Sequence, residues 1–303
     1  RIFTLNGIPL LCYNGDRISR GTIYAAQKEK RGALFYTGFL RRSLFPYKKH
    51  TDKEKIMKVK KTYAVFGLGR YGTAVARELV DNGREVIAID GGHRQDACYF
   101  INFLKEITGQ EKPTIDAWFL THAHNDHFDC FFEVIENHFD EVEIGKIYFN
   151  IPSPQFFDNA PHRDGDSVRT STKFYELLPK FADKIVIVFG GDKYEIGEAK
   201  IDILYTPDYD IVANVGNNSS IVFRVELGGK VILMLADAGV ESGNKLLAKY
   251  KGTGVLKADV CQMAHHGQNG AEKRVYAAIA PTACFWNTPK WLWENDAGLG
   301  YNT

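Results

Sequence analysis

Long apolar segments are absent from the 303-residue chain. The longest runs, Lys184–Phe189 and Val231–Ala236, have the length of buried strands and fall far short of the roughly 18 residues that cross a bilayer. Charge of one sign is also scarce, because 38 basic and 37 acidic residues leave a net charge of +1. We therefore expect no membrane segment and no bulk electrostatic attraction to nucleic acid or to a membrane surface.

Cysteine is scarce and scattered. The five cysteines are odd in number, lie far apart and form no CxxC pair: they are Cys12, Cys98, Cys130, Cys261 and Cys284. This pattern excludes a disulfide framework and a cysteine zinc site, and it favours a reducing compartment, so we expect a cytoplasmic protein. The chain begins with Arg1 instead of Met and ends at Thr303 without a helix stop. We expect it to be a piece of a longer protein, missing its native N-terminus.

The secondary-structure pattern becomes regular only after residue 61. Residues 1–56 show a short apolar run, Ile8–Tyr13, and a basic stretch that we interpret as a solvated linker. A strand at 63–66, a turn at 67–72, a helix at 73–82 and a strand at 85–90 then predict one β-α-β unit. Further expected helices span 95–108, 129–139, 241–251 and 272–279. Further expected strands span 115–120, 146–150, 184–189, 199–205, 220–227, 230–236, 260–264 and 283–286.

The most informative motif is His122-Ala-His124-Asn-Asp126-His127, at the end of an apolar strand. Neutral imidazoles together with a carboxylate suit a borderline divalent ion, Zn²⁺ above all. His122 and His124 point the same way because side chains alternate along a strand, so both can bind one ion. Asp126 and His127 then turn toward a second ion. The alternative is a polar turn with hydrogen-bonded histidines.

A second motif, Gly67-Leu-Gly69-Arg-Tyr-Gly72, has the GxGxxG spacing between an expected strand and an expected helix. Such glycines let a helix N-terminus approach a pyrophosphate, and Asp90 lies where the ribose-binding acid of that fingerprint lies. The spacing is common by chance, and the alternative is a tight turn without a ligand. We expect NAD not to bind, because half a Rossmann fold lacks the opposite wall of the crevice.

The first motif resembles the HxHxDH signature of the metallo-β-lactamase superfamily, and the resemblance covers about residues 86–303. Asp90-Gly91-Gly92 is similar to the family's first motif, Asp237 to its bridging aspartate, and Ala264-His265-His266-Gly267 to its last histidine. With Asn217-Asn-Ser-Ser220, these residues resemble most the ComEC-like branch, which includes the hydrolase domain of the bacterial DNA-uptake protein. The resemblance implies an α/β (α+β) fold, the αββα sandwich, truncated at the C-terminus.

The resemblance also implies the members of the site. It assigns one ion to His122, His124 and Asp237, and the other to Asp126, His127, Asp237 and His265, with His266 as the alternative. The cofactor is one or two Zn²⁺ ions, with Mn²⁺ or Fe as the other options. Asp90 orients a metal-binding histidine from behind. Asp126 and Asp237 are the catalytic candidates, and Asn217, Ser220, His266 and Gln268 are the candidates for substrate contact.

One histidine of the wider superfamily has no counterpart. Only His138 and His162 lie between the HxHxDH motif and Asp237, and neither stands at the expected strand end, where the chain has Tyr205–Tyr209. ComEC-like members also tend to lack this histidine. We therefore expect an open position or weak occupancy at the first ion.

The second motif resembles a different family. Lys60–Val80 and Glu85–Asp90 are similar to the start of a regulator-of-K⁺-conductance (RCK) domain, as in TrkA/KtrA potassium-uptake subunits. This predicts three parts: a leader over 1–56, a partial Rossmann-like β-α-β unit over 57–90 and a hydrolase domain over 86–303. Gly67, Gly69 and Gly72 are the weak candidates for cofactor binding.

The expected function is that of a metal-dependent hydrolase in which a metal-activated water attacks a phosphodiester or a similar ester. The substrate is a small molecule or a nucleic acid, and the oligomeric state stays open. Two alternatives remain: a nucleotide-binding regulatory module related to K⁺ uptake, and a degenerate, inactive sandwich.

Overall fold

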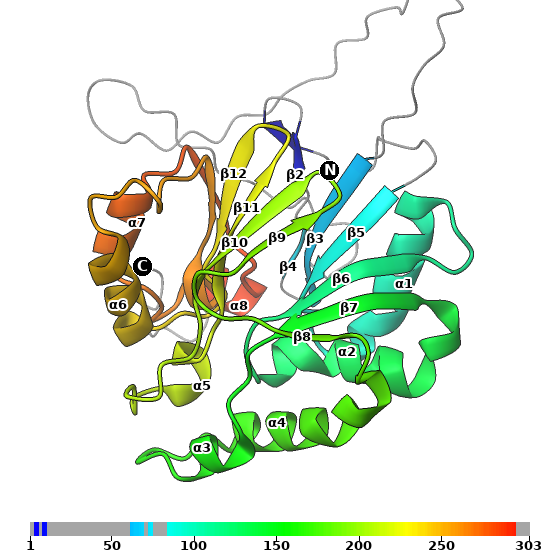
Figure 1. Cartoon of the computed structure of the whole chain (residues 1–303), viewed down its shortest axis with the longest axis horizontal. Coiled ribbons are helices and arrows are strands. Elements are labelled where there is room, and N and C mark those ends of the chain that lie inside the picture. The colour runs from blue at the N-terminus through cyan, green and yellow to red at the C-terminus, as the bar shows by residue number, and fades with distance from the viewer. Residues whose placement is uncertain (1–2, 6–7, 11–60, 70–71, 75–83, 295–303) are drawn as a thin grey trace, which may run out of the picture.

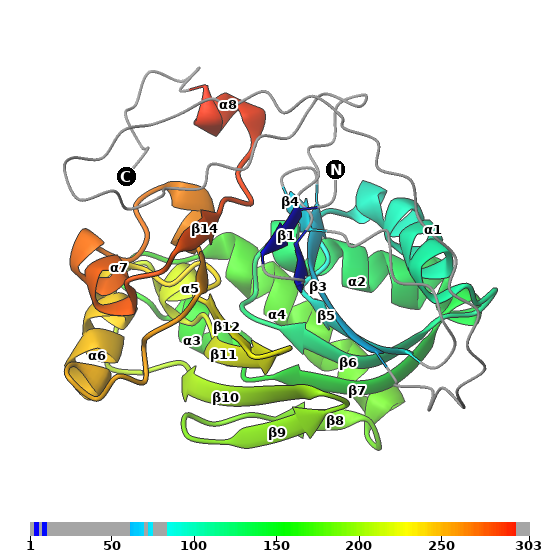
Figure 2. The same ribbon diagram turned by 90° about the horizontal axis from the view of Figure 1, so that it is seen from above.

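The computed structural model describes residues 3–5, 8–10, 61–69, 72–74 and 84–294. In these residues two six-stranded sheets pack face to face, and helices cover their outer faces (Figures 1 and 2). This layer order confirms the expected αββα sandwich. None of the helices in these ranges is long and apolar enough to cross a membrane.

The central strands of the first sheet, β5, β6 and β7, are largely buried on both faces. Its order is β4-β3-β5-β6-β7-β8, and all neighbours except β3 and β4 are parallel. Two adjacent residues of β6 show the two faces: Trp118 packs on Phe100 and Phe131 of the helices, and Phe119 stacks 5.0 Å from Phe223 of the second sheet. Covered parallel strands of this kind read as continuous apolar runs, as this one does. The strands are β3 (Lys61–Gly69), β4 (Gly72–Ala74), β5 (Arg84–Ile89), β6 (Thr114–Leu120), β7 (Glu143–Phe149) and β8 (Ile185–Ile187).

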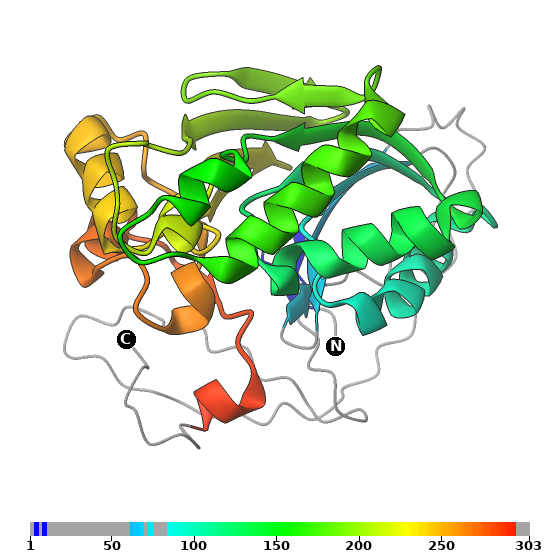
Figure 3. The same cartoon turned by 90° about the horizontal axis from the view of Figure 1, so that it is seen from below.

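Three long helices lie side by side over the outer face of this sheet (Figure 3). The first of them buries residues spaced three and four apart, such as Phe100, Leu104 and Ile107, which is the stripe that a half-buried helix needs. It ends at Gly109, whose φ of 67° suits the left-handed cap. The helices of this half are α1 (Ala97–Thr108), α2 (Asn125–Asn137), the short α3 (Pro154–Asp158) and α4 (Gly165–Leu177).

The second sheet alternates its side chains between two cores. Ile232 and Met234 face the core between the sheets, and Leu233 and Leu235 face the core under α6 and α7, as the period of two in a strand requires. Its order is β14-β13-β12-β11-β10-β9. The elements of this half are β9 (Lys193–Ile196), β10 (Ala199–Tyr205), α5 (Val215–Asn218), β11 (Val222–Leu227), β12 (Lys230–Met234), α6 (Val240–Tyr250), β13 (Val260–Gln262), α7 (Lys273–Ile279), β14 (Ala283–Phe285) and α8 (Lys290–Trp293).

The structure differs from the sequence prediction at the GxGxxG motif. Gly67 and Gly69 belong to β3, and Gly72 begins β4, which runs antiparallel to β3 and pairs Gly69 with Gly72. The expected turn at 67 and helix from 73 are wrong at the described positions, because glycines that permit a strand-to-helix turn serve a hairpin equally well. The rest of that helix lies outside the described residues. The two strands of the predicted β-α-β unit, β3 and β5, are parallel neighbours as that prediction requires. On its other side, β5 pairs with β6.

Several other predictions fall on residues outside the described ranges. They are the basic stretch of the leader, Cys12 and the last residues of the tail. Within the leader, β1 (Phe3–Leu5) and β2 (Ile8–Leu10) pair antiparallel as a separate two-stranded sheet.

Candidate metal centre

Loops at one edge of the sandwich carry the site. Asp90 follows β5, and the HxHxDH motif follows the neighbouring parallel strand β6 and runs directly into the first turn of α2. From the second sheet, Asp237 comes three residues after β12, and His266 lies in the turn after its parallel neighbour β13. Parallel strands end at the same edge of a sheet, so residues far apart in sequence converge there.

Asp237 is the common partner of three imidazoles. Its Oδ2 lies 3.2 Å from His266 Nε2, 3.3 Å from His127 Nε2 and 3.8 Å from His122 Nε2. Asp126 Oδ2 lies 3.1 Å from the same nitrogen of His266. Two overlapping groups of donors result, His122–His127–Asp237 and Asp126–His127–His266, and within each group the ligand atoms lie within 4.8 Å of one another.

The opposite ring nitrogens are held from outside. His127 Nδ1 lies 2.8 Å from Asp90 Oδ2, and His266 Nδ1 lies 2.8 Å from the carbonyl oxygen of Asn287. Both partners only accept hydrogen bonds, so the network assigns the proton to Nδ1 of each ring and leaves Nε2 as a metal ligand. Thr121 holds His122 in the same way. Its hydroxyl donates a hydrogen bond to Asp90 at 2.7 Å and lies 3.2 Å from His122 Nδ1, which leaves His122 Nε2 as a metal ligand.

The residues fit a divalent cation. His127 Nε2, His266 Nε2 and Asp237 Oδ1 are buried and make no hydrogen bond among the described residues. A buried polar atom without a hydrogen bond is costly, and the carboxylate oxygens within 3.3 Å of the two nitrogens form ion pairs with them only when the rings are protonated. The three atoms therefore indicate a cluster that is built to hold a cation. Nitrogen and carboxylate donors suit Zn²⁺, Mn²⁺ and Fe.

In the metal-free site, burial and the neighbouring carboxylates shift the pKa values of the histidines in opposite directions. Burial disfavours the charged form of His127, but Asp237, Asp126 and Asp90 outweigh burial and raise its pKa well above the ordinary value. The same balance, with Asp237 and Asp126 as the carboxylates, raises the pKa of His266 to about 10. For His122 burial prevails, helped by the charge of His127, and its pKa is well below the ordinary value. Protons therefore take the place of cations when no metal is bound.

We expect the metal-free protein to lose stability as the pH rises from 7 toward 10. His266 has a pKa of about 10 in the fold against an ordinary value of 6.5. A folded-state pKa above the unfolded value stabilises fully below pH 6.5, and this stabilisation is lost as the pH rises through 10. Scanning calorimetry in chelator at pH 7 and pH 9.5 measures the change. A melting temperature that is equal at both values, or that falls equally in His266→Gln, contradicts the assignment.

Backbone strain is concentrated at this edge. Asp90, Ala236, His265 and His266 have φ values of 54°, 48°, 49° and 56°, in the left-handed region that few non-glycine residues adopt. Each costs of order 1–3 kcal/mol, which the surrounding structure must offset. These four positions either belong to the site or immediately precede one of its residues, and the other non-glycine residues with positive φ in the described ranges are Asn214, Asn269 and Ala280.

The structure reverses the order of preference between the two adjacent histidines. β13 ends at Gln262, and the left-handed residues that follow turn His266 inward to Asp126 and Asp237. His265 is less buried, and its Nε2 lies 3.3 Å from Asn217 Nδ2. A simple strand end would have presented the first histidine, but the reversed backbone presents the second.

The expected substrate contacts separate into two groups. Ser220 is fully buried, and its hydroxyl accepts a hydrogen bond from Asp237 N, so it supports the ligand from behind and does not face a substrate. Asn217 lies beside His265, and Gln268 is half-buried in the loop that follows, where its backbone N–H donates to the His265 carbonyl. His266 lies within the cluster of donors.

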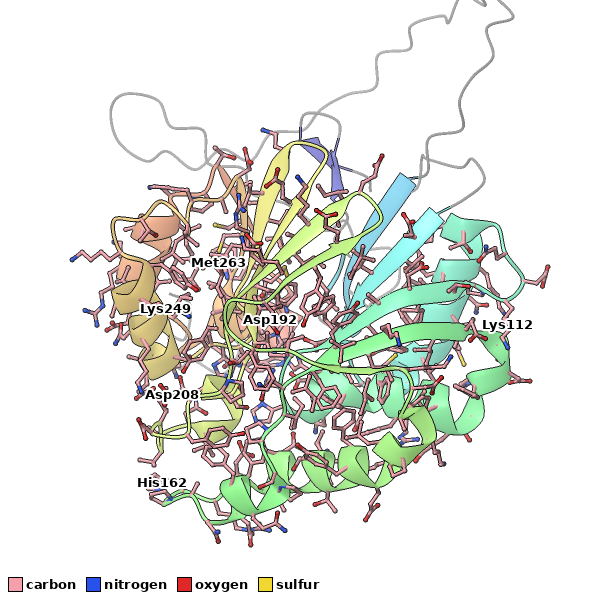
Figure 4. All side chains as sticks on the ribbon, in the orientation of Figure 1. Lys112, His162, Asp192, Asp208, Lys249 and Met263 are labelled. Carbon is pink, nitrogen blue, oxygen red and sulfur yellow. The ribbon has the colours of Figure 1, made fainter. Side chains whose placement is uncertain are left out.

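Neither His138 nor His162 replaces the missing family histidine. His138 lies at the end of α2 against Glu141, and the exposed His162 is seen at the outer edge of the molecule beside α3 (Figure 4). Tyr205 ends β10 facing the core under α6 and α7, and Asp208, labelled in Figure 4, pairs with Lys245.

Sequence reasoning missed three supporting residues: Thr121, Asp164 and Asn287. Asp164 lies 3.0 Å from His124 Nε2, and His124 holds the pKa of this carboxyl at about 2 even though burial acts in the opposite direction. Thr121 stands immediately before the motif, which is a usable signal. Nothing local in the sequence signals contacts made from 40 or 21 residues away.

Comparison with known proteins decides the family. A family model described as the metallo-beta-lactamase superfamily matches residues 79–280. The chain belongs to the metallo-β-lactamase superfamily. The superfamily binds divalent metals and is of hydrolase type, in agreement with the donor cluster described above. No curated protein matches the chain.

Solved structures match the chain only at low identity. YhfI from Bacillus subtilis, a metallo-β-lactamase fold protein, is 15% identical over 67% of this chain and 73% of its own, with a TM-score of 0.37. Zn²⁺-bound PqqB from Methylobacterium extorquens is 15% identical over 58% and 55%, with a TM-score of 0.36. The diiron β-hydroxylase CmlA from Streptomyces venezuelae is 15% identical over 62% and 31%, with a TM-score of 0.31. The chain thus spans about a third of CmlA and about half of PqqB.

Proposed function

We propose that the chain is a metal-dependent hydrolase that acts on a phosphodiester or a similar ester. The observation that carries the proposal is the convergence of buried imidazole nitrogens on Asp126 and Asp237, with the opposite ring nitrogens tethered from outside. Tethered donors keep their geometry without an ion and bind one with little reorganisation, which is the arrangement of a working metal site.

The proposed roles combine the position of each donor with the family resemblance. The structure groups His122 with His127 and Asp237, and the resemblance adds His124, whose Nδ1 lies 3.2 Å from His122 Nε2. His122, His124 and Asp237 hold one ion, and Asp126, His127, Asp237 and His266 hold the other. A divalent ion held there acts as a Lewis acid and lowers the pKa of water. Asp237 is buried, so it serves as a shared ligand, whereas the Asp126 side chain is 27% exposed and can accept the proton of an attacking water.

Phosphodiester chemistry is supported by the residues around the donors. The Asn217–Ser220 segment, Asp237 and the His265–His266 pair are those that resemble the ComEC-like branch. Asn217 and His265 bring an amide and an imidazole together beside the cluster, and such groups can donate to the non-bridging oxygens of a diester. The metal is Zn²⁺, with Mn²⁺ or Fe as the other options, and the substrate is a small molecule or a nucleic acid.

The proposed organisation is one hydrolase domain from β5 onward with an added edge. β3 and β4 supply that edge through the pairing of β3 with β5, which supports a sheet-extending role for these two strands in place of a nucleotide-binding role. The four cysteines in the described residues are unpaired, which supports a reducing compartment such as the cytoplasm.

We expect hydrolysis to require both the metal and His127. Chelator treatment should abolish cleavage of bis(p-nitrophenyl) phosphate, and added Zn²⁺ or Mn²⁺ should restore it. His127→Ala removes a donor shared by both groups and should lower kcat/KM by at least ~100-fold, more than the loss of an outer partner costs. The assay is paired with metal analysis of the purified protein.

His138→Ala is the matched control, because this histidine lies at the other end of α2 and contacts Glu141 instead of the cluster. It should keep the parent's metal content and activity. Activity that survives in His127→Ala or in chelator would overturn the proposal and favour a degenerate, inactive site whose background activity has another origin.

A further inference from the structure

Asp164 joins the first turn of α4 to the second histidine of the motif. Its Oδ2 lies 3.0 Å from His124 Nε2, and its Oδ1 accepts a hydrogen bond from Ser167 N, which caps the helix. The two side chains are 19% and 17% exposed. The hydrogen bond from the helix end therefore fixes the carboxylate in the position from which it contacts the imidazole, and the carboxylate is not a mobile surface group.

The two nitrogens of His124 have different neighbours. Nδ1 lies 3.2 Å from His122 Nε2, on the side of the donor cluster, whereas Nε2 faces Asp164. An ionised carboxylate only accepts, so the contact assigns the proton to Nε2 and leaves the lone pair on Nδ1. Asp164 thus contacts the ring nitrogen that does not face the donor cluster, and it leaves Nδ1 as the metal ligand.

The contact between Asp164 and His124 lies directly against the backbone of Gly216. A Cβ on Gly216 would lie 2.2 Å from Asp164 Oδ2 and 2.3 Å from His124 Nε2, so the contact depends on glycine at this position. The neighbouring Asp166 accepts a hydrogen bond from Asn125 N at 3.0 Å, which ties the start of α4 to the start of α2. Two helix ends therefore hold the pair together.

We propose that Asp164 is a positioning residue that fixes the tautomer and orientation of His124 for the first ion. The inference rests on the proposed function, and it explains how a site without the family's third-motif histidine can still be competent. The first ion has only three proposed ligands, His122, His124 and Asp237. If His124 were not correctly oriented, only two ligands would remain. Asp164 serves His124 as Asp90 serves His127, from the other side of the site.

Two substitutions separate positioning from helix capping. Asp164→Ser keeps a good N-cap but is too short to reach His124, and Asp164→Ala removes both the cap and the contact with His124. Zn²⁺ is titrated calorimetrically into the chelator-treated full chain, with His124→Ala as the calibration. We expect Asp164→Ser and Asp164→Ala to weaken the same binding step as His124→Ala by about 10–100-fold, and only Asp164→Ala to lower the metal-free melting temperature as well. Asp158→Ser, which removes an exposed carboxylate paired with Arg163, should change nothing.

The outcomes distinguish the inference from the function beneath it. A parent chain that binds no Zn²⁺ overturns both. A parent that binds Zn²⁺, together with an Asp164→Ser variant of equal affinity, overturns the inference alone. A Zn²⁺ affinity that falls only in Asp164→Ala, together with the metal-free melting temperature, would make Asp164 a helix cap only and would also overturn it.

Discussion

Asp237→Asn is expected to lower kcat/KM by at least ~100-fold and to remove metal from both proposed positions. The carboxylate faces three imidazole nitrogens at 3.2–3.8 Å, so its charge acts on the donors of both proposed ions. Asn preserves the shape but removes the charge that, against the opposing effect of burial, keeps the pKa of His127 and His266 high. The measurements are metal stoichiometry and steady-state kinetics with bis(p-nitrophenyl) phosphate.

Asp210→Asn provides the comparison for this variant, because it neutralises an exposed aspartate in the loop after β10. It should behave as the parent in both measurements. Unchanged metal content and kcat/KM in Asp237→Asn would rule out a shared role for Asp237 and with it the two-ion assignment.

Asp90→Asn is expected to weaken metal binding by about 10–100-fold while the protein stays folded. The carboxylate accepts from Thr121 N, Thr121 Oγ1 and His127 Nδ1, at 2.7–2.8 Å. Asn tolerates the left-handed backbone at this position, but its NH₂ group then faces donors. Because Thr121 passes the orientation on to His122, both proposed ions should be affected. Calorimetric Zn²⁺ titration measures the loss.

The same exchange at Asp140, an exposed aspartate beyond α2, controls for the loss of charge. The metal-free Asp90→Asn protein should also unfold with a free energy about 2 kcal/mol lower, from the lost hydrogen bonds to a charged group. Parent-like Zn²⁺ affinity in Asp90→Asn would show that His127 is held in place by packing alone.

Elements with a strong periodic or apolar signal were predictable from the sequence. The helix expected over 95–108 spans Ala97–Thr108, and the strand expected over 199–205 has those bounds in the structure. The helix expected from 129 begins at Asn125, because the motif itself forms the first turn of α2. The polar N-terminal turn hides that start from a pattern of apolar residues. α4, whose 13 residues carry few apolar side chains, was missed for the same reason.

The members of the candidate site were predictable, but their arrangement was not. His122, His124, Asp126 and His127 form a local pattern, and Asp90 and Asp237 follow strands that can be recognised. The choice of His266 over His265 depends on two left-handed residues, which no propensity predicts. The contact of Asp164 with His124 depends on how α4 packs beside α2, and tertiary packing of this kind leaves no trace in either segment.

The distribution of the donors over both sheets has a consequence for folding. His127 and His266 come from opposite halves of the sandwich, about 140 residues apart, and neither half holds a complete set of donors. Metal capture therefore follows the docking of the two sheets, a slow event for contacts of such long range. Once captured, an ion links the halves and retards their separation. The rate at which the refolding chain takes up metal therefore reports the rate at which its two sheets dock.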